Sequence, residues 1–125
     1  MQPTAAERDE LFTAFGRAFF RQDLDAMYEV VTDDFTWSIL FDGMPRVSST
    51  REQVAAFFEE RRGVQRDVRF EDVVFHHAPE ATFMTYRVTG VDVASNEPFE
   101  RVGVERYTFR DGRIAEKDVY SRPVA

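Results

Sequence analysis

Two adjacent pairs of side chains have types that could take part in acid–base or metal chemistry. Asp33-Asp34 is a pair of carboxylates, and His76-His77 contains both histidines of the chain. The carboxylates stand at a predicted helix end, where acidic residues commonly solvate a turn. Adjacent residues of a strand point to opposite faces, so the two imidazoles cannot bind one metal ion together. No other residues have the spacing of metal ligands, so the sequence predicts no metal site.

Several other kinds of chemistry lack their usual sequence patterns. The chain has no cysteine, which excludes thiolate catalysis and a disulfide framework. The glycines are isolated, so no glycine-rich phosphate loop is present, and no Ser-His-acid pattern is found. No cofactor is therefore expected. Any chemistry has to come from charged side chains placed among apolar ones.

Such charges are concentrated in residues 99–120, which read as two long strands joined by a turn. The turn is supplied by residues 110–113, where Gly112 is free to adopt a positive φ. A two-stranded ribbon is not stable alone in water, so the preceding chain has to cover one of its faces. If the covered face lines a pocket, some of these charges line it too.

The pattern of apolar residues predicts the elements that provide this cover. Leu11, Phe12, Phe15 and Phe19 recur at helical spacing after a capping box formed by Thr4 and Glu7. The predicted order is a helix ending near Gln22, a second helix capped by Asp23 and closed at 32–34, a strand at 35–39, a loop at 41–48, a third helix at 51–62 stopped by Gly63, and strands at 68–77, 82–93 and 99–120.

Length and composition agree with one small domain. The 125 residues include 13 phenylalanines, which predicts an aromatic core or a cavity lined by rings. Helices followed by long strands predict the α+β class, with three N-terminal helices packed on a strongly curved, mainly antiparallel sheet in a cone-shaped roll. A net charge of −7 argues against nucleic acid as a partner. Without a signal peptide or an apolar span, the expected location is the cytoplasm, away from the membrane.

Two motifs, in this order, resemble the nuclear transport factor 2-like superfamily and, within it, the SnoaL-like and ketosteroid-isomerase-like group. The first consists of residues 23–26, Asp-Leu-Asp-Ala, followed by residues 31–37, Val-Thr-Asp-Asp-Phe-Thr-Trp. The second is residues 109–114, Phe-Arg-Asp-Gly-Arg-Ile, followed by Tyr120. The resemblance extends over residues 7–120 and implies one SnoaL-like domain over residues 1–125. Since this fold supports enzymes, carriers and scaffolds, it implies no single chemistry.

The resemblance also allows the catalytic positions of known relatives to be compared with this chain. The ketosteroid isomerase base falls at Ile39, and the tyrosine and aspartate of its oxyanion hole fall at Phe15 and Glu105. The catalytic aspartate of epoxide hydrolases falls at Val119. Three of these four residues cannot exchange a proton, so neither activity is expected. Glu105 is the candidate catalytic acid or base.

The resemblance places a ligand cavity between the helices and the sheet. Residues 41–46 would form its rim, with Phe41, Met44 and Pro45 as apolar contacts and Asp42 and Arg46 as polar ones. Strand alternation puts Glu105 on the cavity face, either in an ion pair with Lys117 or desolvated by the rings with a raised pKa. The predicted ligand-binding residues are Phe15, Phe19, Trp37, Ile39, Phe58, Tyr86, Tyr107, Lys117 and Val119.

Two functions remain open from the sequence. The first is a pocket protein that binds a small hydrophobic, cyclic molecule without catalysis. The alternative is an isomerase, cyclase or hydrolase that uses Glu105. In either case the family resemblance implies a homodimer through the outer face of the sheet. That face is expected to contain Val102, Val104, Arg106, Thr108, Ile114, Glu116, Asp118 and Tyr120.

Overall fold

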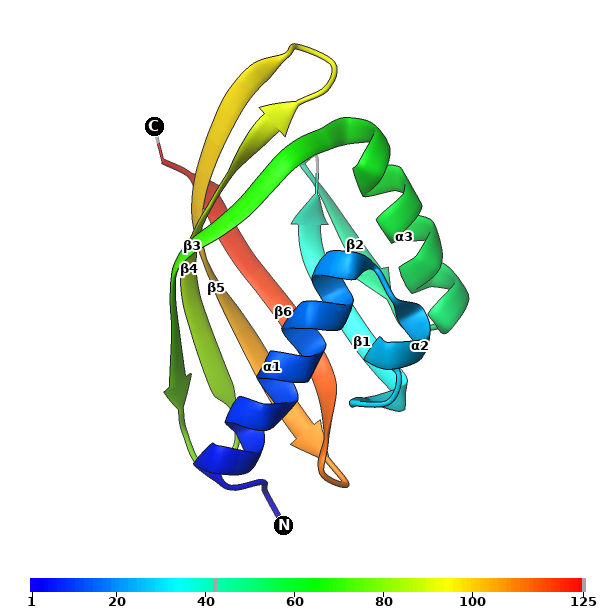
Figure 1. Ribbon diagram of the computed structural model, residues 1–125, viewed down its shortest axis with the longest axis vertical. Coiled ribbons are helices and arrows are strands. Elements are labelled where there is room, and N and C mark those ends of the chain that lie inside the picture. Colours follow the sequence, from blue (N-terminus) through cyan, green and yellow to red (C-terminus); the bar gives the residue numbers. More distant parts are fainter. Residues whose placement is uncertain (42, 125) are drawn as a thin grey trace.

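The computed structural model describes residues 1–41 and 43–124, which form three helices and one sheet. The elements are α1 (Ala5–Arg21), α2 (Leu24–Met27), β1 (Val31–Phe41), β2 (Met44–Ser48), α3 (Arg51–Val64), β3 (Gln65–His77), β4 (Thr82–Asp92), β5 (Glu97–Arg110) and β6 (Arg113–Pro123). The strand order is β2-β1-β6-β5-β4-β3, and only the β1–β6 pair is parallel. The sheet is strongly curved, and the helices lie over its concave side (Figure 1). The predicted α+β class is confirmed.

Helix α1 begins and ends as its sequence predicts. The Thr4 side chain accepts a hydrogen bond from the Glu7 backbone, and the Glu7 side chain accepts one from the Thr4 backbone. Gln22 ends the helix in the left-handed conformation, with φ 54°. The apolar stripe of α1 buries Phe12 and Phe15 against the sheet.

Arg8 anchors the start of α1 to the β3–β4 turn. Its side chain is buried and donates hydrogen bonds to the carbonyl oxygens of Ala78, Pro79 and Ala81, at 2.6, 3.0 and 3.2 Å. The guanidinium also lies 4.8 Å from the centre of the Phe109 ring. These contacts fix the position of α1 over the sheet.

The predicted end of the second helix is wrong. Helix α2 stops at Met27, and β1 already begins at Val31, so residues 32–34 lie in a strand. Val31 pairs with Ile114 of β6, and the Ile114 backbone donates to the carbonyl of Val30 at 3.0 Å. Because this parallel partner is distant in sequence, the local apolar pattern does not reveal it. Asp33 and Asp34 are exposed where the β1–β6 register shifts.

Two further predicted boundaries are also wrong. Part of the expected loop at 41–48 is β2, which forms a hairpin with β1 and places Met44 opposite Phe41. Pro45 is compatible with β2 because this strand is at the edge of the sheet. Gly63 does not stop the third helix: α3 continues to Val64, and the chain becomes extended at Gln65.

The β5–β6 hairpin confirms the predicted turn. Asp111 and Gly112 both have positive φ, 54° and 73°, as a two-residue hairpin turn requires. A bulge next to the turn pairs Phe109 with Ile114 but Thr108 with Glu116. The extra residue reverses the facing of β6, so Ile114 is fully buried. Its predicted place on the outer face of the sheet is therefore wrong.

The core between helices and sheet is largely aromatic. Phe35, Trp37 and Phe57 are almost completely buried, and Trp37 contacts the rings of Phe19, Phe57 and Phe58 at centroid distances of 5.0, 4.7 and 5.5 Å. Burial of each large ring contributes about 1.5–3 kcal/mol. In the part of the chain that the structure describes, no helix has the length and apolar character needed to cross a membrane.

Candidate functional site

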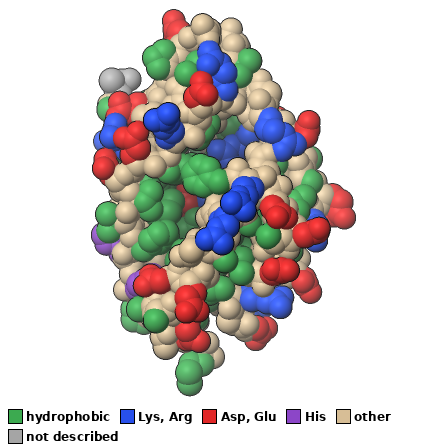
Figure 2. All heavy atoms as spheres, in the orientation of Figure 1, with side chains coloured by type: hydrophobic (Ala, Val, Ile, Leu, Met, Phe, Trp, Pro, Cys, Tyr) green, Lys and Arg blue, Asp and Glu red, His purple; other side chains and the backbone are tan. Residues whose placement is uncertain are grey.

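A cavity of about 850 Å³ opens between α3 and the concave side of the sheet. Figure 2 shows this face of the molecule, with apolar side chains around a hollow and basic side chains within it and beside it. The cavity is lined by seven of the ten predicted site residues, namely Phe19, Trp37, Ile39, Tyr86, Glu105, Lys117 and Val119. These residues come from α1, β1, β4, β5 and β6, so the tertiary structure brings them together.

The other three predicted site residues line smaller spaces beside the main cavity. Phe15 and Tyr107 line one of about 140 Å³ beneath α1, and Phe58 lines one of about 190 Å³ at the end of α1. Phe15 lies edge-on to Tyr107, with 5.9 Å between the ring centres. In this structure these rings support the walls of the main cavity.

Glu105 and Lys117 form a buried ion pair at the cavity wall. Their side chains are only 3% and 4% exposed, and Lys117 Nζ donates to Glu105 Oε1. The Tyr107 hydroxyl donates to the same oxygen and accepts from Lys117 Nζ at 3.0 Å. The structure thus contains the ion pair, the first of the two arrangements considered from the sequence. The pair forms because Lys117 lies opposite Tyr107 in the β5–β6 register, one diagonal step from Glu105.

Burial dominates the electrostatics of this cluster. It lowers the pKa of the Lys117 ammonium, an effect that the Glu105 carboxylate opposes. It raises the pKa of the Tyr107 and Tyr86 hydroxyls, and the negative charge of Glu105 raises both further. Glu105 Oε1 accepts from both Lys117 and Tyr107, so this geometry suits a hydrogen-bond acceptor or general base better than a proton donor.

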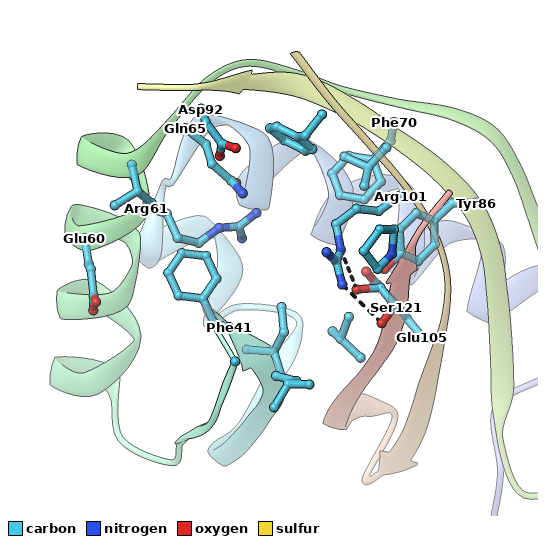
Figure 3. A pocket seen from close by; sticks show the side chains of 18 of the residues that line it. Phe41, Glu60, Arg61, Gln65, Phe70, Tyr86, Asp92, Arg101, Glu105 and Ser121 are labelled. Atoms are coloured by element: carbon cyan, nitrogen blue, oxygen red, sulfur yellow. Dashed lines mark hydrogen bonds between the residues drawn. The ribbon is translucent and has the colours of Figure 1, made fainter. Parts of the chain in front are cut away.

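Arg61 is a site residue that the sequence interpretation missed. It extends from the last turn of α3 into the cavity (Figure 3). Its guanidinium carbon lies 5.9, 5.6 and 5.8 Å from the ring centres of Phe19, Trp37 and Phe57. Within residues 1–41 and 43–124, Arg61 makes no side-chain hydrogen bond or ion pair. Burial lowers the pKa of Arg61, with the Glu105 charge acting in the opposite direction.

Arg101 is a second missed residue, on the opposite wall. Its Nε donates to Ser121 Oγ at 3.1 Å, and its Nη2 donates to the Ser121 carbonyl at 3.2 Å. Figure 3 shows Arg101 beside Ser121 and Glu105, across the cavity from Arg61. Among the described residues, Nη1 of Arg101 has no hydrogen-bond partner. Both arginines are thus positioned with donors left for another molecule.

Sequence signals for both arginines were present. Val54, Phe57, Phe58 and Arg61 follow one helical stripe, so Arg61 continues the apolar face of α3 toward the sheet. Arg101 lies two residues before Gly103 and four before Glu105, which places all three on the cavity face of β5. Arginine is also a common residue in the last turn of a helix, so the pattern alone did not show that Arg61 enters the cavity.

Gly103 lies at a position of β5 where a side chain would have no room. The register of β5 with both neighbours is regular at this position. A Cβ at Gly103 would lie 2.5 Å from the Tyr86 hydroxyl oxygen and 2.9 Å from the Tyr120 carbonyl oxygen. The close approach is therefore made by the Tyr86 ring, which crosses over Gly103 to reach the cavity.

The predicted rim is only partly found. Phe41 lines the cavity, whereas Met44 and Pro45 are exposed on the edge strand β2. Arg46 forms an ion pair with Glu60 at 2.6 Å and lies over the Phe57 ring. The predicted contact at Asp42 lies outside the described residues.

Both histidines make hydrogen bonds with side chains that lie next to them in the fold. His77 contacts Thr82 Oγ1 and Asp9 Oδ1, both at 2.9 Å, and His76 contacts Thr85 Oγ1 at 3.2 Å. Over the described ranges, no three His, Cys, Asp or Glu side chains are grouped so that they could hold a metal ion.

Comparisons with known proteins give the same fold. A Burkholderia xenovorans NTF2-like protein has 18% identity and a TM-score of 0.81 over 95% of this chain and 92% of its own. A candidate polyketide cyclase from Xanthomonas campestris has 22% identity and a TM-score of 0.75 over 92% and 90%. A Catenulispora acidiphila protein with a ketosteroid isomerase-like fold, in complex with trimethylamine, has 16% identity and a TM-score of 0.72 over 89% and 84%.

None of the curated proteins matches the chain. The family model of the SnoaL-like domain matches residues 12–117, which include the second half of α1, the ion pair and both cavity arginines. The curved sheet, the helices on its concave side and the cavity between them agree with that match. The chain therefore belongs to the SnoaL-like domain family.

Proposed function

We propose that this protein binds a small hydrophobic, ring-containing molecule in the cavity of about 850 Å³. The observation that carries this proposal is the wall of Phe19, Trp37, Phe70 and Tyr86 around a volume suited to a small organic molecule. Flat rings on these walls offer edge and face contacts to a flat ligand. The cyclase and the trimethylamine complex among the structural neighbours differ in chemistry, so the ligand has to be argued from this chain.

Binding is tested with the neutral fluorescent probe N-phenyl-naphthylamine. We expect saturable binding that Val119→Phe weakens by about tenfold, because the added ring occupies the cavity that Val119 lines. The matched control is Val74→Phe, since Val74 is 49% exposed on the edge strand β3. Equal binding by both variants would contradict the proposed cavity, provided that their circular dichroism spectra match the wild type.

The second candidate function is catalysis by Glu105, as an isomerase, cyclase or hydrolase. It is favoured by one observation: the paired carboxylate, with Tyr107 on the same oxygen, lies at the wall of a ligand-sized cavity.

Ile39 and Val119 also line the cavity, and neither has an atom that accepts a proton. We therefore expect no ketosteroid isomerase or epoxide hydrolase activity. Turnover of a 5-ene-3-ketosteroid would contradict this expectation.

We also propose a homodimer through the outer face of β5 and β6. Val104 and Tyr120 are cross-strand neighbours there, with 37% and 63% of their surfaces exposed. Arg106 lies 3.9 Å from Asp118 on the same face. An apolar centre with paired charges beside it suits a self-complementary contact between two copies.

A further inference from the structure

Two of the three cations that line the cavity have no carboxylate partner among the described residues. Three cations, Arg61, Arg101 and Lys117, line it together with one buried carboxylate, Glu105. Of the other two acidic residues along its border, Glu60 is paired with Arg46, and Asp92 is exposed. The cavity thus brings three cations together in a chain whose net charge is −7.

Lys117 is not available to bind an anionic ligand, because its ammonium group already interacts with other side chains of the protein. Its ammonium donates to Glu105 and to Tyr107 within the protein. The pair of Glu105 and Lys117 is therefore close to neutral toward a ligand. Arg61 and Arg101 remain as the two positive groups without a carboxylate partner among the described residues.

The donors of the Arg61 guanidinium are not used by hydrogen bonds within the described residues. Its guanidinium has five N–H donors, yet it lies among three aromatic rings without a hydrogen bond to any described residue. A guanidinium in this position can therefore donate to a ligand without breaking an ion pair or hydrogen bond of the protein. Trp37 lies beside Arg61, and its buried indole N–H has no acceptor in the described structure.

Arg101 can also donate hydrogen bonds to a ligand, from the opposite wall of the cavity. Its Nε and Nη2 donate to Ser121, which fixes the plane of the guanidinium and leaves the remaining edge for another molecule. A guanidinium held in this way matches the planar oxygens of a carboxylate. Figure 3 shows the two arginines extending into the cavity from α3 and β5, with Tyr86 and Phe70 beside Arg101.

From this arrangement we infer that the ligand is an organic acid: a ring-containing body against the aromatic wall, with its anionic group between Arg61 and Arg101. This inference rests on the proposed function, since it names the class of ligand for the same cavity. The two arginines favour a ligand with a negative charge, whereas the aromatic rings favour a ligand with a ring-containing body. Neutral hydrophobic molecules bind the rings only and therefore bind more weakly.

The test compares two fluorescent probes with the same ring system. Anilinonaphthalene sulfonate carries an anionic group, and N-phenyl-naphthylamine does not. We expect the wild-type protein to bind the anionic probe about tenfold more tightly, and Arg61→Gln or Arg101→Gln to remove about tenfold of that affinity. Affinity for the neutral probe should change by less than about twofold in both variants. Naphthoate should likewise displace the bound probe better than naphthamide does.

The matched control is Arg69→Gln, which makes the same charge change at an exposed position of β3. It should leave the affinity for both probes unchanged. Arg61→Gln should melt no lower than the wild type, which separates lost recognition from lost folding. If both probes bind equally and the arginine variants affect them alike, the organic-acid inference is overturned while the proposed function stands. If neither probe binds, the proposed function itself is overturned.

Discussion

Lys117 and Glu105 form an ion pair in which the two side chains are 4% and 3% exposed, so water cannot replace either partner. Each charge is satisfied by the other and by Tyr107, which contacts both. A buried pair of this kind adds little net stability when intact, but removing one partner leaves an uncompensated charge. The pair is therefore a structural requirement of the cavity wall as well as a possible centre of chemistry.

Glu105→Gln should lower the free energy of unfolding by about 3–5 kcal/mol, because Lys117 keeps its burial but loses its carboxylate. Urea denaturation measures the change. Glu116→Gln is the matched control, since Glu116 is exposed on the same hairpin, and its effect should be within about 0.5 kcal/mol. The double variant Glu105→Gln, Lys117→Met should recover most of the loss. A single Glu105→Gln variant as stable as the wild type would contradict the ion-pair account.

Stability should fall at alkaline pH because of Tyr86 and Tyr107. The pKa of both hydroxyls is raised from an ordinary value of 10.0, mainly by burial and then by Glu105. Above that pH the unfolded tyrosines lose a proton that the folded ones keep, so unfolding becomes more favourable as pH rises. Urea midpoints measured from pH 8 to pH 11 should show this fall, and Tyr107→Phe should reduce its slope. Equal slopes for the variant and the wild type would show that Tyr107 does not contribute.

Gly103→Ala should disturb the cavity through Tyr86. The added methyl group would lie 2.5 Å from the Tyr86 hydroxyl oxygen and 2.6 Å from the ring carbon that carries it, so either Tyr86 or β5 has to move. We expect a cost of about 1–3 kcal/mol in stability and weaker probe binding. Gly16→Ala is the matched control, because no atom lies within 4 Å of a Cβ at that helical position. It should stabilise α1 by about 0.5–1 kcal/mol. Loss of stability in both variants would contradict this account of Gly103.

The outer face of the sheet should hold the proposed dimer together. Tyr120→Glu places a charge at the exposed centre of that face, next to Val104. Sedimentation should then change from a species of twice 14.6 kDa to the monomer. Val74→Glu, on the exposed edge strand β3, should leave the dimer intact. A wild-type protein that sediments as a monomer at micromolar concentration would refute the proposal.

Local chemistry in the sequence determined most of the elements. The Thr4–Glu7 capping box began α1, and Asp111-Gly112 formed the predicted turn, because caps and turns depend on neighbouring residues. Strand alternation also put Glu105 on the cavity face, and it left open whether Lys117 paired with it. These features needed no knowledge of the rest of the fold.

The tertiary structure decided the features that depend on distant partners. Val31 joined a strand rather than a helix because β6 pairs with it in parallel, and a bulge turned Ile114 from the outer face into the core. Arg61 became a cavity residue because α3 directs the end of its apolar stripe over the sheet, opposite Arg101. A sequence specifies the charge and spacing of such residues, but whether a charge meets water, a carboxylate or an empty cavity depends on segments that only folding brings together.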